Sequence, residues 1–506
     1  MNNAKIKILV VLGCMTFAAA KTYAQNNLQR IDSLVNDLCQ RNELSGNILV
    51  ASKGQIVYKY SHGYADVADK KLNNDSSAFK LASLAKPFTA IAILQLEEKG
   101  KLKLDDAVVK YLPDFPFNDI TIRQLLSHTS GLTDLQIFQA PHNADTSKIF
   151  SNADIIPAIK ADKNAVIAKP GEKWSYSNTG FGILALIVEK ITAISFGDYL
   201  TKYIFRPAEM SHTYISSILV NVNPGDKNRT KNYDFLSYAP SRLKVADSMK
   251  KYKITLVTLG GMLGFDNIIS TTEDLLRFDQ ALYTAKLLSP SILQEAFVPT
   301  KLNNGQNVLC GWGKTRAYYG LGWMILCDST YGKIVFHPGG DIGAVTILLR
   351  NITSNQTVIV LDNVTHRGVH ATGVDIMTLL NNRHILADKQ SLAKIYANCL
   401  FEKGADYAAN RLNKLKADTS HYFMDERELN SIGYDLLNDG YHIEGLEALK
   451  LNTVLFPNSW NVYDSYGEAL AKNGKKEEAI AMYKKSIKMN PGNNGGKDAL
   501  KRLETK

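Results

Sequence analysis

The positions of apolar residues follow two periods, which predict a β-rich start and end around a helical middle. Near the start, one face of a predicted helix is apolar: Leu28, Ile31, Leu34, Val35 and Leu38. Residues 47–51 and 56–60 are β-rich and are separated by Lys53-Gly54, which predicts two strands joined by a turn. From about Phe79 to Ile215 the pattern is mainly helical.

Three further β-rich runs follow one another closely, at residues 333–337, 344–349 and 357–361. Their short spacing predicts an antiparallel meander. Strands at both ends of a segment with a helical middle predict an α+β domain. Its antiparallel sheet would be built from both ends of the domain, with an all-helical subdomain between them.

The last part of the chain repeats itself at an interval of 34 residues. The matching pairs are Gly433 with Gly467, Leu436 with Leu470, Gly440 with Gly474, and Pro457 with Pro491. This period is typical of tetratricopeptide repeats, in which each repeat is a helix–turn–helix unit. Residues 444–451 and 478–485 would be the second helices of two repeats. Ala448 and Met482 depart from a common consensus, so the prediction rests on the glycine, leucine and proline positions.

Composition adds a cellular context to this pattern. The chain has 506 residues, of which 45% are hydrophobic and 21% charged, as is typical of a globular protein with two or three domains. Residues 1–24 have a basic start, an apolar centre and a small-residue end at Ala24, which predicts a secretory signal peptide. Lipoprotein processing at Cys14 is the alternative. After the signal, no apolar run is long enough to predict a membrane span.

The net charge of +10 is scattered, and no stripe of Arg and Lys with aromatic residues predicts nucleic-acid binding. Four cysteines would enter an oxidising compartment on export: Cys39, Cys310, Cys327 and Cys399. Cys310 and Cys327 are the most plausible disulfide pair, and unpaired buried thiols are the alternative. His366 and His370 lie four apart in a loop-like stretch, which does not predict a metal site.

Ser83-Leu84-Ala85-Lys86 places a serine and a lysine three residues apart at the start of an apolar helical run. At this spacing both side chains share one helical face, so the amine can reach the hydroxyl and act as its base. The same spacing recurs at Ser77, Ser241, Ser248 and Ser391. Only Ser83 is followed by a long helix-compatible run, which ends at Lys99-Gly100.

Tyr176-Ser177-Asn178 precedes a predicted helix over residues 180–191. A tyrosine beside a cationic lysine can have its phenol pKa lowered, which would suit it for proton transfer. Asn178 offers a carbonyl acceptor and an amide donor, suited to holding Lys86 and a substrate amide together. A loop tyrosine with a capping asparagine is the alternative.

His337-Pro338-Gly339-Gly340 follows the predicted strand at 333–337. Two glycines at this position let the backbone approach a ligand closely and expose an N–H group to it. Together with the N–H group of Ser83, such a donor would form an oxyanion hole, in which one donor contributes about 10²–10³ in rate. A turn between strands is the alternative.

In this order, the three motifs resemble those of the serine β-lactamase and penicillin-binding-protein superfamily, and within it the class C-like serine hydrolases. The resemblance covers about residues 28–380. Three further segments support it: 125–132, 269–275 and 319–323. It implies a β-lactamase-like fold and an acyl-enzyme mechanism.

The resemblance also implies a role for each motif residue. Ser83 would be the acylated nucleophile, and Lys86 its proton acceptor or the cation that tunes Tyr176. Tyr176 would pass the proton to the leaving group and later activate water. Asn178 would orient Lys86 and the substrate. The N–H groups of Ser83 and Gly340 would form the oxyanion hole.

The third motif departs from the family pattern. Members that process β-lactams usually have Lys-Thr-Gly there, and its cation and hydroxyl bind the substrate carboxylate. Here His337 replaces the lysine and Pro338 the hydroxyl residue, so these contacts are largely lost unless His337 is protonated. The departure favours an esterase or an aminopeptidase/amidase.

We therefore predict an exported serine hydrolase, periplasmic or secreted, that acts on a small ester, amide or peptide without a metal or organic cofactor. D-alanyl-D-alanine-type peptidase, penicillin-binding and β-lactamase activities are alternatives within the family. A non-catalytic envelope scaffold that binds proteins through the repeats is the alternative of another class. The predicted segments are a signal peptide (1–24), a hydrolase domain (25–385), a helical linker or cap (386–420) and the repeats (421–506).

Overall fold

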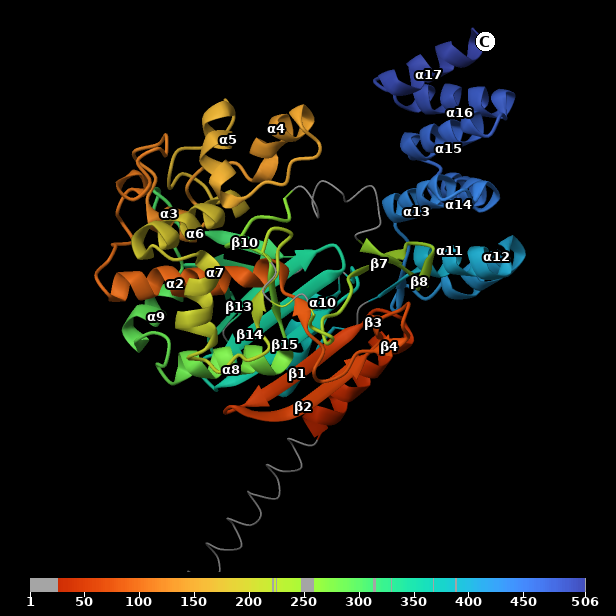
Figure 1. The fold of residues 1–506 in the computed structure, drawn as a ribbon. Coiled ribbons are helices and arrows are strands. Elements are labelled where there is room, and N and C mark those ends of the chain that lie inside the picture. The colour runs from red at the N-terminus through yellow and green to blue at the C-terminus, as the bar shows by residue number, and fades with distance from the viewer. Residues whose placement is uncertain are drawn as a thin grey trace, which may run out of the picture. The chain divides into compact units, whose positions relative to one another are not determined.

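The computed structural model describes residues 26–220, 223, 225–246, 259–312, 315–328, 330–366, 368–386 and 389–505. The predicted signal peptide at 1–24 lies outside these described residues. The chain divides into two units (Figure 1). The first comprises Met1–Asp234 and Val245–Ile385, and the second comprises Phe235–Lys244 and Leu386–Lys506.

An eight-stranded antiparallel sheet forms the centre of the first unit, in the order β10-β11-β12-β13-β14-β15-β1-β2 (Figure 1). Its strands are β1 (Gly46–Ser52), β2 (Gln55–His62), β10 (Leu309–Trp312), β11 (Thr315–Tyr319), β12 (Met324–Leu326), β13 (Ile334–Asp341), β14 (Ala344–Asn351) and β15 (Gln356–Asp362). The pairing of β1 with β15 confirms that the sheet joins both ends of the unit. The predicted turn between β1 and β2 is also confirmed, with positive φ at Lys53 (52°) and Gly54 (75°).

The middle of the first unit is mainly helical, as predicted. Its α-helices are α2 (Lys86–Glu98), α3 (Ile122–Leu126), α4 (Gln139–Ala144), α5 (Ile155–Ala161), α6 (Asn178–Thr192), α7 (Phe196–Leu200), α8 (Thr272–Tyr283) and α9 (Pro290–Ala296), with α10 (Val369–Leu380) after the sheet. Shorter elements complete it: β3 (Tyr64–Asp66), β4 (Lys71–Leu72), β5 (Phe79–Lys80), β6 (Tyr214–Ile215), β9 (Ile268–Ser270) and the single turns η1 (Ala82–Ala85), η2 (Val108–Lys110), η3 (Leu135–Phe138), η4 (Asn152–Asp154) and η5 (Thr201–Phe205).

The sheet is the middle layer of the first unit because neighbouring residues of each strand face opposite sides. Ile48 and Val50 of β1 belong to a core shared with α10 and the helical residues 26–40. Leu49 and Ala51 face a second core, which includes α2, α6 and α8. Helices on both faces of an antiparallel sheet confirm the predicted α+β architecture.

Among the described residues, no single helix is both long and apolar enough to cross a bilayer. Helix α6 and residues 196–205 have that length and composition only when taken together, and they are bent by 79° at the break between them.

The second unit is helical and has the predicted repeat spacing. Its helices are α11 (Leu392–Lys403), α12 (Ala405–Leu415), α13 (Glu426–Asn438), α14 (His442–Leu455), α15 (Trp460–Lys472), α16 (Lys476–Met489) and α17 (Asn494–Glu504), and β16 (Gln390–Ser391) pairs with β17 (Tyr422–Phe423). The repeated Gly440 and Gly474 lie between the helices of two hairpins and have φ of 90° and 75°. At Gly433 a Cβ atom would lie 2.6 Å from Leu449 Cγ, so this glycine permits close helix packing. The assignment to tetratricopeptide repeats stays a prediction.

A hairpin from the middle of the sequence forms part of the core of the second unit. It is made by β7 (Tyr233–Leu236) and β8 (Ala239–Val245). Tyr238 is fully buried in a cluster with apolar residues of α11 and α13. Its hydroxyl donates to Asp439 at 2.6 Å, and Lys244 donates to the same carboxylate at 3.2 Å. Residues far apart in the sequence therefore complete one core.

We expect Tyr238→Ala to lower the free energy of unfolding of the second unit by about 3–5 kcal/mol, because it removes a buried aromatic ring. Tyr238→Phe should cost only about 1–2 kcal/mol, since the ring stays and the hydrogen bond to Asp439 is lost. Hydrogen exchange of the α11 and α13 amides in the full chain measures both effects. Unchanged protection in Tyr238→Ala would contradict the role of the hairpin in this core.

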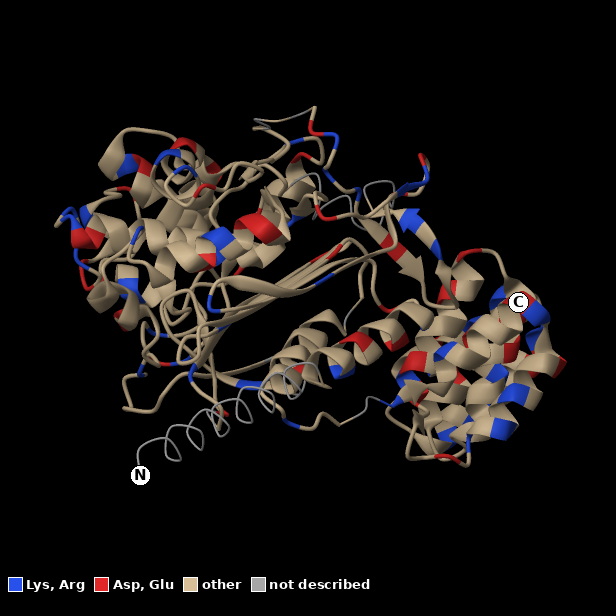
Figure 2. Cartoon of the chain, turned by 90° about the horizontal axis from the view of Figure 1, so that it is seen from below, with Lys and Arg blue, Asp and Glu red and all other residues tan. Residues whose placement is uncertain are grey.

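Charges of both signs are interspersed over the described elements of both units (Figure 2). Many of them form ion pairs, such as Lys59 with Asp75 at 2.6 Å and Lys286 with Glu209 at 2.6 Å. In this view the Lys and Arg residues of the described elements do not line up in a continuous stripe of the kind that follows a nucleic-acid backbone.

Candidate active site

Ser83 lies on η1, a single 3₁₀ turn that leads directly into α2 at Lys86. The preceding Ala82 has φ of 51°, a left-handed backbone that is costly for alanine. Two hydrogen bonds hold this turn: Leu81 N–H donates to Ile268 O at 2.9 Å, and Leu84 N–H to Leu81 O at 3.2 Å. Strain of this kind concentrates at functional sites, where the surrounding structure maintains it.

The side chain of Lys86 is buried and lies close to three other predicted residues of the site. Its Nζ donates to Ser83 Oγ at 3.0 Å and to Asn178 Oδ1 at 2.6 Å. It also lies 3.5 Å from the carbonyl oxygen of Phe265 and 4.8 Å from the centroid of the Tyr176 ring. The structure therefore brings Ser83, Lys86, Tyr176 and Asn178 together, although they come from different elements.

The pKa values of Lys86 and Tyr176 shift in opposite directions. Burial lowers the pKa of Lys86 to about 7, against the attraction of Asp134 and Asp266. Burial raises the pKa of Tyr176, and a hydrogen bond with Ser83 opposes this only in part. The expectation that the lysine lowers the phenol pKa is therefore wrong. At neutral pH the phenol is protonated, and a large fraction of Lys86 is neutral and able to accept a proton.

Asp134 is a site residue that the motifs did not predict. It accepts the backbone N–H of Asn178 at 2.6 Å and the side-chain amide at 3.1 Å. Because the amide nitrogen is held there, Asn178 Oδ1 is directed at Lys86. Asn178 is the first residue of α6, and the hydroxyl of Ser177 caps that helix. The sequence feature that could have indicated Asp134 is its position, two residues after the segment 125–132 that supports the family resemblance.

His337 is in the interior of β13, which continues to Asp341 rather than ending at His337 as predicted. Pro338 is paired with Ile347 of β14, so the tetrapeptide is strand and not turn. A carbonyl oxygen only accepts, so His337 Nδ1 donates to Pro338 O at 2.7 Å and Nε2 accepts from the Tyr319 hydroxyl at 3.2 Å.

The protonated form of His337, which the sequence left open, is not favoured. Burial and the nearby Lys86 lower the pKa of His337 to about 3, so the ring is neutral at pH 7. Its one N–H group, on Nδ1, already donates to the backbone carbonyl oxygen of Pro338. Neither His337 nor Pro338 therefore offers the cation or hydroxyl that would bind a substrate carboxylate.

Gly339 brings the end of β13 directly against the turn that contains Ser83. A Cβ atom at this position would lie 2.2 Å from Leu81 O and 3.1 Å from Leu84 N, so only glycine fits. Gly340 follows it and is exposed. The Gly339–Gly340 peptide therefore lies beside the turn that contains Ser83.

An ion-pair network, also missed in the sequence, links the segments that surround the site. Lys80 Nζ lies 2.5 Å from Asp341 Oδ2 and 2.9 Å from Asp266 Oδ2. The other oxygen of each carboxylate accepts the N–H group of the residue that follows it, at 2.8 Å and 2.6 Å. Lys80 precedes Ser83 by three residues, and Asp341 follows Gly340 directly. The network therefore links the segment just before Ser83 to the end of β13.

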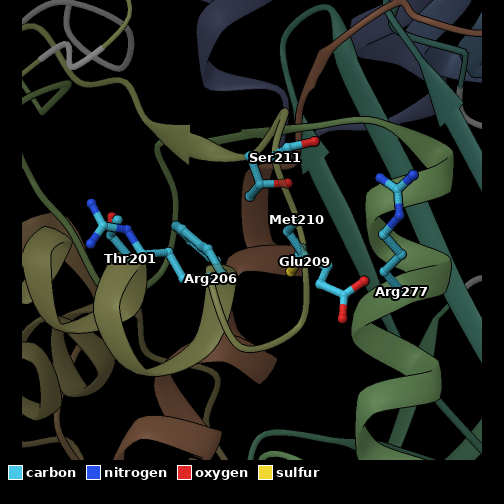
Figure 3. Close-up of a pocket in the computed structure, with 8 residues that line it drawn as sticks. Thr201, Arg206, Glu209, Met210, Ser211 and Arg277 are labelled. Atoms are coloured by element: carbon cyan, nitrogen blue, oxygen red, sulfur yellow. The ribbon is translucent and has the colours of Figure 1, made fainter.

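A cavity of about 610 Å³ lies away from these residues (Figure 3). It is lined by Thr201, Phe205, Arg206, Glu209, Met210, Ser211, Thr213 and Arg277. Two of its charged side chains are already paired, Glu209 with Lys286 at 2.6 Å and Arg277 with Asp274 at 2.5 Å. None of the predicted site residues lines this cavity.

The remaining sequence candidates have other contacts. Cys310 and Cys327 are free thiols, so the disulfide considered from the sequence is not present in the structure. His366 Nδ1 lies 3.0 Å from the carboxylate of Asp362 on β15, whereas His370 Nε2 lies 2.8 Å from the carbonyl oxygen of Gly339. The two histidines therefore bind different partners.

Comparison with known proteins gives a consistent result for the first unit. A family model described as Beta-lactamase matches residues 29–379. Penicillin-binding protein 4* of Bacillus subtilis (strain 168) is 37% identical over 340 residues, which cover 67% of this chain and 72% of that protein. A solved penicillin binding protein from Bacillus halodurans has a TM-score of 0.56 at 26% identity and covers 68% of this chain and 98% of its own. D-amino acid amidase from Ochrobactrum anthropi SV3 has a TM-score of 0.56 at 20% identity, and the match covers 71% of this chain and 99% of the amidase. The two proteins therefore have a similar fold.

Proposed function

The chain belongs to the beta-lactamase family of serine hydrolases, and from this we propose that it hydrolyses a small ester, amide or peptide through an acyl-enzyme on Ser83. The observation that supports this most strongly is the buried amine of Lys86, which lies 3.0 Å from Ser83 Oγ. Its pKa of about 7 suits a base that works near neutral pH. Serine, lysine and tyrosine supply the nucleophile and the proton transfers, so the proposed reaction needs no metal or organic cofactor.

In the proposed mechanism, neutral Lys86 accepts the proton of Ser83 as Oγ attacks the substrate carbonyl. The N–H groups of Ser83 and Gly340 donate to the oxyanion that forms. Asn178 holds the resulting ammonium. The Tyr176 phenol passes its proton to the leaving alcohol or amine and regains one from Lys86, so both residues return to their starting states. Water, activated by the same pair, then attacks the acyl-enzyme, and the proton returns to Ser83 as the acid departs.

The third motif supports an ester or amide substrate without a carboxylate at that end. His337 is neutral and its N–H group is occupied, and Pro338 has no hydroxyl. An anionic group placed there would lose its water without gaining a partner. The fold neighbour named D-amino acid amidase is an enzyme whose name describes an amide substrate.

D-Ala-type peptidase or penicillin-binding activity is the second candidate. It is supported by the name of the relative with 37% identity, Penicillin-binding protein 4*. β-Lactamase activity shares the same nucleophile and would require faster deacylation. The contacts among Ser83, Lys86 and Asn178 weigh against a non-catalytic scaffold, because a scaffold does not need a buried amine against a serine.

A substrate panel separates these candidates. Purified chain would be assayed with p-nitrophenyl esters, D- and L-amino-acid anilides, a chromogenic cephalosporin and a fluorescent penicillin. We expect kcat/KM for the best ester or anilide to exceed that for the cephalosporin by at least about tenfold. Rapid acylation by the penicillin with poor ester turnover would support the peptidase instead.

We also propose that the chain is exported and that its second unit binds a partner or packs against one. Residues 1–24 support export to the periplasm or medium, with a lipid anchor at Cys14 as the alternative. The helical hairpins of the second unit support a role in binding a protein partner or in packing.

A further inference from the structure

His370 is buried on α10 and has no part in the mechanism proposed above. Its Nε2 lies 2.8 Å from the carbonyl oxygen of Gly339. Because a carbonyl oxygen can only accept, Nε2 has the hydrogen and the ring donates. Burial lowers the pKa of His370, so this donor is a neutral imidazole at pH 7.

The hydrogen bond from His370 ends on the peptide that supplies one oxyanion donor. The Gly339 carbonyl and the Gly340 N–H group belong to one peptide plane, and none of the described peptide bonds is cis. In a trans peptide the C=O and N–H groups point in opposite directions. A donor on the carbonyl side polarises the amide, which makes its N–H group a stronger donor on the other side.

Besides His370, this peptide is held by the pairing of β13 with β14, in which Gly339 lies opposite Thr346 and Gly340 opposite Val345. It joins two glycines, which have no side chains to pack, and Pro338 before it has no N–H group. Gly339 lies within about van der Waals reach of the nucleophile turn, since a Cβ there would overlap Leu81 O at 2.2 Å. A small rotation of the peptide would therefore move the Gly340 N–H group away from the oxyanion.

We propose that His370 is a positioning residue for the oxyanion hole, which holds and polarises the Gly339–Gly340 peptide from the side opposite the substrate. This inference rests on the proposed function, because it assumes that Gly340 N–H stabilises an oxyanion formed by attack of Ser83. It predicts that His370 affects the transition state and not the binding of the neutral substrate.

The test uses the full chain with His370→Phe, which keeps a ring but removes the donor, and His370→Gln, whose amide can replace it. We expect kcat for p-nitrophenyl butyrate to fall about 10–100-fold in His370→Phe with KM changed less than about threefold, and to recover in part in His370→Gln. The inhibition constant of phenylboronic acid, which adds to Ser83 and places an anionic oxygen in the hole, should rise by the same factor. His366→Gln, a matched change at the other histidine, should alter kcat less than about threefold.

Each outcome decides the question. Unchanged kcat and unchanged boronic acid inhibition in folded His370→Phe would overturn the inference, as would a lower kcat with unchanged inhibition. If His370→Phe does not fold, His370→Asn, whose shorter amide cannot reach Gly339, is subject to the same criteria. Absence of any wild-type turnover or boronic acid binding would instead reject the proposed function on which the inference depends.

Discussion

Ser83→Ala should abolish hydrolysis, with kcat/KM for p-nitrophenyl butyrate falling about 10⁴–10⁶-fold. The expected loss is large because Ser83 Oγ is the atom that Lys86 Nζ contacts at 3.0 Å, and alanine leaves no atom there to be acylated. Mass spectrometry of the quenched reaction provides a second measurement. Wild type should gain one acyl group during turnover, and Ser83→Ala should gain none.

The chain contains a matched control for this change. Ser241 and Lys244 have the same spacing, but Ser241 is exposed in the hairpin of the second unit. Ser241→Ala should therefore keep kcat/KM within about twofold of wild type. Retention of a tenth or more of the activity by folded Ser83→Ala would reject Ser83 as the nucleophile.

Lys86→Met should lower kcat about 10³–10⁴-fold and at the same time raise the free energy of unfolding by roughly 1–3 kcal/mol. Activity falls because Ser83 loses its proton acceptor. Stability rises because the folded protein no longer buries an amine that prefers to be charged, an effect offset in part by the lost hydrogen bond to Asn178. Enzyme kinetics and chemical denaturation measure the two effects on one preparation.

The same substitution predicts two changes with pH. The folded pKa of Lys86, about 7, lies below its ordinary value of 10.5, so the unfolded chain binds more protons between these values. The contribution of Lys86 to stability therefore rises with pH across that window, and Lys86→Met should remove this rise. In wild type, kcat/KM should increase as the pH passes through about 7.

Lys244→Met is the matched control for Lys86→Met, and it should change neither kcat nor the pH profile by more than about twofold. A wild-type profile that is flat between about pH 6 and 8 would contradict Lys86 as the base. A Lys86→Met variant that is less stable than wild type at pH 7 would show that its hydrogen bonds outweigh the cost of burial.

Local sequence patterns predicted the elements and motifs because these depend on near neighbours. The two-residue period placed the strands, and the three-residue spacing of Ser83 and Lys86 placed the lysine amine beside the serine hydroxyl. The end of the strand at His337 was misplaced because proline and two glycines usually interrupt strands. Here the strand persists to Asp341 because residues 338–341 pair with residues 344–347 of β14, and the glycine at 339 lets the strand pass a neighbouring turn closely.

The electrostatics of the site could not be predicted from motifs. Whether Lys86 lowers the pKa of Tyr176 or has its own pKa lowered depends on how deeply both are buried, which is a property of the assembled core. Asp134 reaches the site through its contact with Asn178, 44 positions later in the sequence. Such pairs have no local signature in a single sequence.

The hairpin at residues 235–244 also imposes an order of events during synthesis. The ribosome makes Tyr238 roughly 150 residues before α11, the first helix that buries it, which corresponds to about 10–30 s of translation. During that interval Tyr238 has none of its neighbours from α11 and α13. Folding of the second unit can therefore finish only after most of the chain has emerged, and a ribosome that stalls before residue 392 releases a chain with this apolar tip exposed.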